Sequence, residues 1–208
     1  DISILKINPI NEIQNLKHLK IQKNSSVLFA NKKIEQKTQT YNNGDKYVGG
    51  FLNGEKHGQG TYIWNDGNKY VGDWLNDKRT GKGALTWKTG GKYVGDWLNS
   101  KRTGKGTYTY KTGSIYEGDW LNNKKHGKGT YIWNDGDKYV GDYLNGNRTG
   151  KGTFYWNNGD KYVGDFVDDE MNGKGIYLYS SGNKYMGDWV NGVKNGQGLF
   201  IWTDGEQY

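Results

Sequence analysis

Histidines are the first residues of this 208-residue chain that could act as general bases or metal ligands. They are His18, His57 and His126, which stand far apart in the sequence. A catalytic or metal site needs several such groups in one place. The chain has no cysteine, so it has neither a thiolate metal ligand nor a disulfide. We interpret His57 and His126 as solvated loop residues, and we predict no metal and no cofactor.

A recurring aspartate is the next group that could bind an ion. Its members are Asp73, Asp96, Asp119, Asp142, Asp165 and Asp188. If each repeat adds two strands to a sheet, neighbouring members lie about 10 Å apart, which is too far to share one cation. Thr or Lys side chains across the sheet are the simpler partners. Gly-x-Gly also recurs, but no helical pattern follows it, which excludes a phosphate-binding loop. We therefore predict that the chain is not an enzyme.

Basic pairs recur in the polar stretches of the sequence and could contact anionic phospholipids. These candidate lipid contacts are Lys78, Arg79, Lys101, Arg102, Lys124 and Lys125. They form a weak basic ridge, and an ordinary solvated turn edge explains them more simply. Residues 1–46 carry eight lysines against four acids, whereas the rest carries 21 basic against 18 acidic residues. Because the larger part is so nearly balanced in charge, we predict no binding to nucleic acid.

All these groups belong to a unit of 23 residues that repeats without a gap. A tyrosine marks the first position of each unit, and we number positions from it. These tyrosines are Tyr47, Tyr70, Tyr93, Tyr116, Tyr139, Tyr162, Tyr185 and Tyr208. Positions 3, 12, 14 and 21 are glycine in every unit, and positions 1, 5, 16 and 18 are aromatic with one exception, Leu85. Such a period indicates one structural unit copied seven times between residues 47 and 207.

Each unit is expected to form two short strands and a tight turn. The mean hydropathy of −1.00 leans towards disorder, but 15% of the residues are aromatic and only one is proline. Tyr70, Gly72 and Trp74 alternate along one strand, so they share a face. Asn65-Asp66-Gly67 then suits a chain reversal. Four glycines per unit would be too costly in a helix. We predict an all-β sheet of hairpins.

The columns of glycine and aromatic residues also predict a register. We expect position 5 to lie opposite the glycine at position 14, and position 16 opposite the glycine at position 3. The tyrosine at position 1 then pairs with position 18. In this arrangement each ring covers a residue without a side chain, and a single sheet buries its rings against its own backbone.

The units resemble MORN (membrane occupation and recognition nexus) repeats. The resemblance is carried by segments such as Tyr116-Glu117-Gly118-Asp119-Trp120, His126-Gly127-Lys128-Gly129-Thr130-Tyr131 and Asp135-Gly136, and it covers residues 47–207. It implies an elongated, twisted, single-layer antiparallel sheet with an aromatic groove. Members of this family act as scaffolds that take up partner helices or extended peptides, or that self-associate. They occur in cytoskeletal and ciliary assemblies, radial spokes among them, and at membrane junctions.

From the residues and the resemblance together we predict a non-catalytic scaffold that binds a protein partner along its aromatic face. The expected partner-binding residues are Phe51, Tyr62, Trp74, Trp97, Tyr108, Trp120, Tyr131, Tyr143, Phe154, Phe166 and Trp189. One alternative is a peripheral tether that binds phospholipid through the basic pairs. Another is a regulatory segment of a larger enzyme, such as a phosphoinositide kinase. The expected location is the cytoplasm, at the cytoskeleton, a cilium or the inner face of a membrane.

Residues 1–46 lack the repeat and are predicted to be an N-terminal extension of the domain at 47–208. Asn8-Pro9 favours a helix start, and Ile10, Ile13 and Leu16 then share one face to about residue 22. Residues 27–41 are expected to form a capping hairpin, whose end resembles the tail of a unit. The helix would pack on the end of the sheet or dock into a groove. No run of about 18 apolar residues predicts a membrane span.

Overall fold

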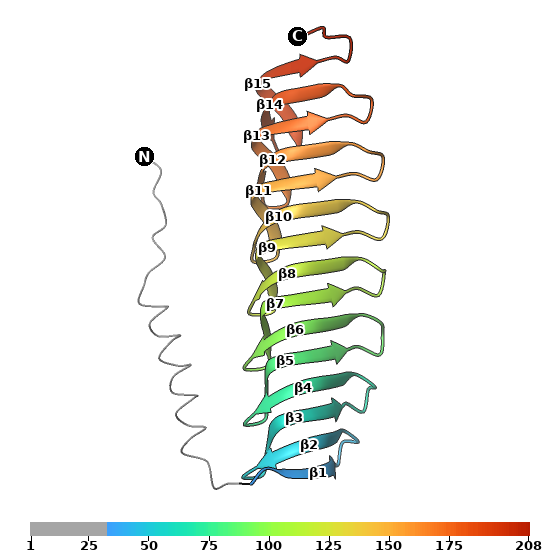
Figure 1. Cartoon of the computed structure of the whole chain (residues 1–208), viewed down its shortest axis with the longest axis vertical. Coiled ribbons are helices and arrows are strands. Elements are labelled where there is room, and N and C mark those ends of the chain that lie inside the picture. The colour runs from blue at the N-terminus through green and yellow to red at the C-terminus, as the bar shows by residue number, and fades with distance from the viewer. Residues whose placement is uncertain (1–32) are drawn as a thin grey trace, which may run out of the picture.

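The computed structural model describes residues 33–208 as one long antiparallel sheet (Figure 1). Its strands follow one another in chain order, each hydrogen-bonded to the strands before and after it. Within residues 33–208 no helix and no second sheet covers either face, which confirms the predicted single-layer all-β fold. The strands are β1 (Glu35–Thr40), β2 (Lys46–Leu52), β3 (Glu55–Ile63), β4 (Lys69–Leu75), β5 (Lys78–Thr86), β6 (Lys92–Leu98), β7 (Lys101–Thr109), β8 (Ile115–Leu121), β9 (Lys124–Ile132), β10 (Lys138–Leu144), β11 (Asn147–Tyr155), β12 (Lys161–Val167), β13 (Glu170–Leu178), β14 (Lys184–Val190) and β15 (Val193–Ile201).

Strand β1 precedes the first unit and covers its outer edge by pairing with β2. The turn after β1 has the geometry of the later ones, because Tyr41 N donates to Asp45 O at 2.9 Å and Gly44 has φ 87°. This turn therefore has the same geometry as the turn that ends a unit. The predicted helix at about 9–22 and the first half of the capping hairpin lie outside the described residues.

Two kinds of turn connect the strands of every unit. Within a unit, a two-residue turn such as Asn76-Asp77 has positive φ at both residues, 49° and 62°. Asn and Asp tolerate this conformation, and it matches the right-handed twist of a hairpin. Between units, Trp64 N donates to Asn68 O at 3.0 Å and Gly67 adopts φ 90°. In each hairpin a seven-residue strand pairs with a nine-residue strand.

The predicted register is wrong by two residues. The glycines at positions 3 and 14 pair with each other, as in Gly72↔Gly83, and the tyrosine at position 1 pairs with position 16, as in Tyr93↔Tyr108. Two features set the observed register, a two-residue turn and an irregularity in the longer strand. Leu75 pairs with Lys78 across the turn, but the register shifts between Gly72 and Asp73. Position 12 lies in this shift, and there Gly81 has φ 53°, a conformation that favours glycine.

Paired glycines nevertheless seat a ring, and that ring is the tyrosine at position 1. A Cβ on Gly106 would lie 2.6 Å from Cε2 of Tyr93. A Cβ on Gly95 would lie 2.6 Å from the hydroxyl oxygen of the same tyrosine. Tyr93 is fully buried, and its hydroxyl donates to Asp96 O at 3.0 Å. The sheet therefore buries a large side chain against its own backbone.

The aromatic residues at position 5 complete the core between these tyrosines. The Trp97 ring meets Tyr93 of its own unit edge-on, with centroids 5.2 Å apart, and meets Tyr70 of the preceding unit at 5.4 Å. Edge-to-face pairs of this kind are favourable beyond the area that they bury. The core is thus a continuous row of alternating rings along the length of the sheet.

We expect Gly106→Ala to destabilise the protein by about 2–3 kcal/mol, because the new methyl group overlaps the Tyr93 ring and the backbone around it cannot yield. The midpoint of urea unfolding measures the effect. Thr107→Ala, on the same strand but on the opposite face, is the control and should change the stability little. An unchanged midpoint for Gly106→Ala would contradict this account of the core.

Candidate functional site

The two faces of the sheet carry different side chains, and one of them contains a groove. One face carries the rings at positions 1, 5, 16 and 18, and we call it the aromatic face. The other carries positions 2, 4, 13 and 15. On that second face a groove of about 1870 Å³ runs along the sheet from Lys82 in β5 to Gly198 in β15. The groove is therefore on the face opposite to the aromatic residues.

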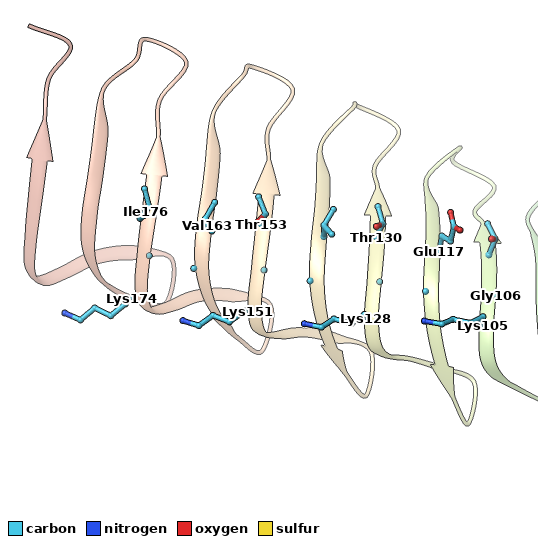
Figure 2. Close-up of a pocket in the computed structure, with 18 of the residues that line it drawn as sticks. Lys105, Gly106, Glu117, Lys128, Thr130, Lys151, Thr153, Val163, Lys174 and Ile176 are labelled. Carbon is cyan, nitrogen blue, oxygen red and sulfur yellow. The ribbon is translucent and has the colours of Figure 1, made fainter. Parts of the chain in front are cut away.

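The groove has an apolar side, a charged side and a floor of glycine backbone (Figure 2). The apolar side is a row of small and β-branched side chains at positions 2 and 15. It includes Val94, Thr107, Thr130, Val140, Val163 and Ile176. The charged side is a row of lysines at position 13. It consists of Lys82, Lys105, Lys128, Lys151 and Lys174.

The recurring aspartates stand next to these lysines and hold the units together. Asp119 forms an ion pair with Lys105, whose Nζ lies 2.6 Å from the carboxylate, and it accepts a hydrogen bond from Lys128 N at 3.0 Å. At the far end of the sheet, Lys174 holds the pKa of Asp188 below its usual range, chiefly through a hydrogen bond. Lysine as the cross-strand partner confirms the simpler interpretation of this column. The described residues contain no group of His, Asp and Glu side chains that could hold a metal ion.

The prediction that His57 and His126 are solvated loop residues is wrong. They lie within strands β3 and β9 and are half-buried, because the connecting turn is only two residues long. His126 faces Asp119 across the hairpin. Nδ1 of each ring is buried and has no hydrogen-bond partner in the described part of the chain. The two rings belong to units three repeats apart and do not form a common site.

The predicted partner-binding residues lie in or against the core. The seven residues at position 5 are only 2–5% exposed: Phe51, Trp74, Trp97, Trp120, Tyr143, Phe166 and Trp189. At position 16, Phe154 is buried, whereas Tyr62, Tyr108 and Tyr131 are half-buried. The structure thus brings these rings together, but it leaves little of their surface for a partner. They stay a prediction as a binding site.

Basic side chains at position 10 cover the aromatic face further. The Arg79 guanidinium lies 4.4 Å from the Trp97 ring centroid, and its Nη2 donates to Ser100 O at 3.1 Å. Arg102 repeats both contacts one unit later, and burial lowers the pKa of each guanidinium. Lys125 lies 4.8 Å from the Tyr143 ring. Three of the six candidate lipid contacts are therefore engaged by rings, whereas Lys78, Lys101 and Lys124 are exposed.

The rings at position 18 are further candidates on this face and were not among the predicted binding residues. Trp87 and Tyr110, at position 18, alternate with Tyr108 and Tyr131, at position 16, and successive ring centroids are 5.2, 4.4 and 5.6 Å apart. All four are half-buried, so part of each ring reaches solvent. On the other face, the regular Val and Thr at positions 2 and 15 could have indicated the groove.

Comparison with known proteins gives a family match and distant structural likenesses. A family model described as the MORN repeat matches residues 47–69, 70–92, 93–115, 116–138, 139–161, 162–184 and 185–207. The search of curated proteins finds no match. The chain is similar to the TCP domain of Drosophila melanogaster SAS-4 in complex with a proline-rich motif of Ana2, with 14% identity over 83% of this chain and 87% of that one and a TM-score of 0.46. It is also similar to the TCP10 domain of Danio rerio CPAP with a STIL peptide, with 12% identity over 84% and 97% and a TM-score of 0.25.

Trp97→Ala and Trp120→Ala should each lower the free energy of unfolding by about 3–5 kcal/mol, because each removes a buried ring from the aromatic row. Urea unfolding measures the effect. Leu98→Ala is the control, since that side chain is 51% exposed. If either tryptophan variant kept its stability but lost a protein partner, the aromatic face would be the binding face.

Above pH 10 the buried tyrosines should make the fold sensitive to alkali. Burial is the main cause that raises the pKa of Tyr47 and of Tyr162 to about 12, whereas an unfolded tyrosine titrates near 10. Their contribution to stability is therefore complete below pH 10 and is lost as the pH rises to about 12. We expect phenolate absorbance and loss of β circular dichroism to appear in one transition. The chain in denaturant is the control, and phenolate formation near pH 10 with the sheet intact would contradict this.

Proposed function

Because the chain belongs to the MORN repeat family, we propose that it is a non-catalytic scaffold that holds an extended segment of a partner protein in the groove of its sheet. The groove is the single observation that carries this proposal. It combines an open apolar row, an ordered backbone floor and a charged border on a continuous sheet. A location in a cytoskeletal or ciliary assembly belongs to the same proposal and follows from the family resemblance.

The exposed apolar row supports a protein as the occupant. Val94, Val140 and Val163 line the groove at position 2 and are between 39% and 46% exposed. Exposed apolar side chains gathered along one groove are typical of an interaction site. The lysines on the other side are paired with aspartates, so the groove has no strong field of one sign. It is therefore better suited to a polypeptide than to a polyanion.

The width of the groove favours an extended segment over a helix. Positions 2 and 4 are two residues apart along a strand, which separates the apolar and charged rows by about 7 Å. A helix with its side chains is about 10–12 Å across and would span more than this channel. An extended chain also advances about 10 Å in three residues, which matches the spacing of successive units.

The alternatives find less support in the geometry. The aromatic face is packed and covered by basic side chains, so a partner there would reach chiefly the rings at position 18. A lipid site would rest on Lys78, Lys101 and Lys124, since the other three candidates lie on rings. A regulatory segment of a larger enzyme would use the same groove.

The double variant Val94→Asp with Val163→Asp should weaken binding of the native partner about tenfold or more, about 1.4 kcal/mol, because it places charge in the apolar row. The partner is captured from a lysate of the source cells, identified by mass spectrometry, and measured again with purified protein. Leu98→Asp with Leu144→Asp is the matched control, because these leucines are somewhat more exposed than the two valines but do not line the groove.

Two outcomes would contradict the proposal. Loss of the partner on Trp87→Ala with Trp133→Ala, while the valine variant binds normally, would assign the site to the aromatic face. Binding only to anionic vesicles, abolished by replacing Lys78 and Lys101, would assign the protein to a membrane surface.

A further inference from the structure

The first unit differs from the other six at the charged side of the sheet. In the later units a Cβ on the glycine at position 12 would meet the aspartate at position 4, as Gly104 meets Asp96 Cβ at 3.0 Å. The first unit has Gly50 at position 4 instead. There the side chain of Ile34 takes the place of the carboxylate. A Cβ on Gly58 would lie 3.8 Å from Cδ1 of Ile34.

Gly50 is required for this arrangement. A Cβ at residue 50 would lie 2.7 Å from Cγ2 of Ile34, so an aspartate and this isoleucine exclude each other. The side chains of positions 3 and 4 point to opposite faces, and position 3 points to the aromatic face. Ile34 therefore lies on the face that carries the groove. Ile34 contacts the Cβ positions of Gly50 in β2 and Gly58 in β3, and the groove begins two strands further along the same face, in β5.

The preceding segment has the length and composition to fill the groove. The groove extends from β5 to β15, which is about 48 Å at the usual strand spacing. Thirty-two extended residues cover about 100 Å, enough to pass β3 and β4 and to run the length of the groove. The segment is rich in isoleucine and leucine, including Ile10, Ile13 and Leu16. In an extended chain Ile10 and Leu16 share a face, which can lie on the apolar row of the groove.

The charge of the segment is also compatible with the groove. Residues 1–32 contain five lysines against two acids. In the groove, Glu117 stands at position 2, where the other units have Val or Met, and its cross-strand neighbours are Thr107 and Thr130. Glu117 makes no ion pair in the described part of the chain. A lysine of the segment would complete it, and a single charge in an apolar row fixes the register of its occupant.

We propose that residues 1–32 occupy the groove of their own sheet, so that an external partner has to displace them. The occupant is thus a segment of this chain, which is joined to the sheet at Ile34, before the start of the groove, and would pair with Glu117 within the groove. Only the displacement rests on the function proposed above; the occupancy itself does not. The groove would be available to a partner in proportion to the fraction of time that the segment is released.

Thiol labelling of the full chain tests this proposal, because the protein has no cysteine of its own. Val94→Cys or Val140→Cys places one thiol in the groove, and Asn134→Cys places one in a turn as the control. Each is combined with the native N-terminal segment or with a segment carrying Ile10→Asp, Ile13→Asp and Leu16→Asp. If the segment covers the groove nine-tenths of the time, the substituted segment should speed labelling in the groove about tenfold and leave the turn unchanged.

Equal labelling rates with both segments would overturn the proposal and would leave the groove free for a partner, so the proposed function could still hold. Rates that depend on protein concentration would also overturn it, because they would assign the cover to a second copy. Circular dichroism of every variant confirms that the sheet is intact. Glu117→Lys should by itself accelerate labelling in the groove, and slower labelling would contradict the charge argument.

Discussion

The contact between a tyrosine ring and a pair of facing glycines is the constraint on which the rest of this structure depends. A sheet with no second layer has nothing else against which to bury large side chains within residues 33–208. The ring of Tyr93 lies where the side chains of Gly95 and Gly106 would otherwise stand. Glycine weakens a strand when nothing fills the space that it leaves. Here the space is filled by a ring, and the same contact recurs in every unit.

That contact also makes the two faces unequal. On the aromatic face, the rings pack against one another and basic side chains such as Arg79 and Arg102 close over them. On the other face, the glycines expose a bare backbone between two rows of smaller side chains, and the surface stays hollow. Under the proposed function, stability and recognition belong to opposite faces. A partner could then be exchanged on one face without disturbing the core on the other.

Much of the fold could be predicted from the sequence because the period is strict. Tyrosine every 23 residues, alternating strands and Asn-Asp-Gly turns led to the all-β sheet of hairpins. The register could not be predicted, because it depends on the irregularity at Gly81, whose positive φ is invisible in a glycine-rich pattern. The groove was not predicted, because the recurring aromatic residues lie on the opposite face. Val94 and Thr107 are ordinary strand residues, and the regular recurrence of such residues at positions 2 and 15 was the sequence signal for the groove.

The links between successive units give the molecule a further property. Lys105 reaches forward to Asp119, and the equivalent ion pair joins each unit from the second onward to the next. Adding or deleting a whole unit leaves every such joint intact, whereas inserting a single residue would break the pattern. The length of the sheet therefore changes in steps of about 10 Å, one step for each unit. Duplication or loss of a repeat in the gene would therefore change the reach of the sheet in steps of one unit, without a change in its cross-section.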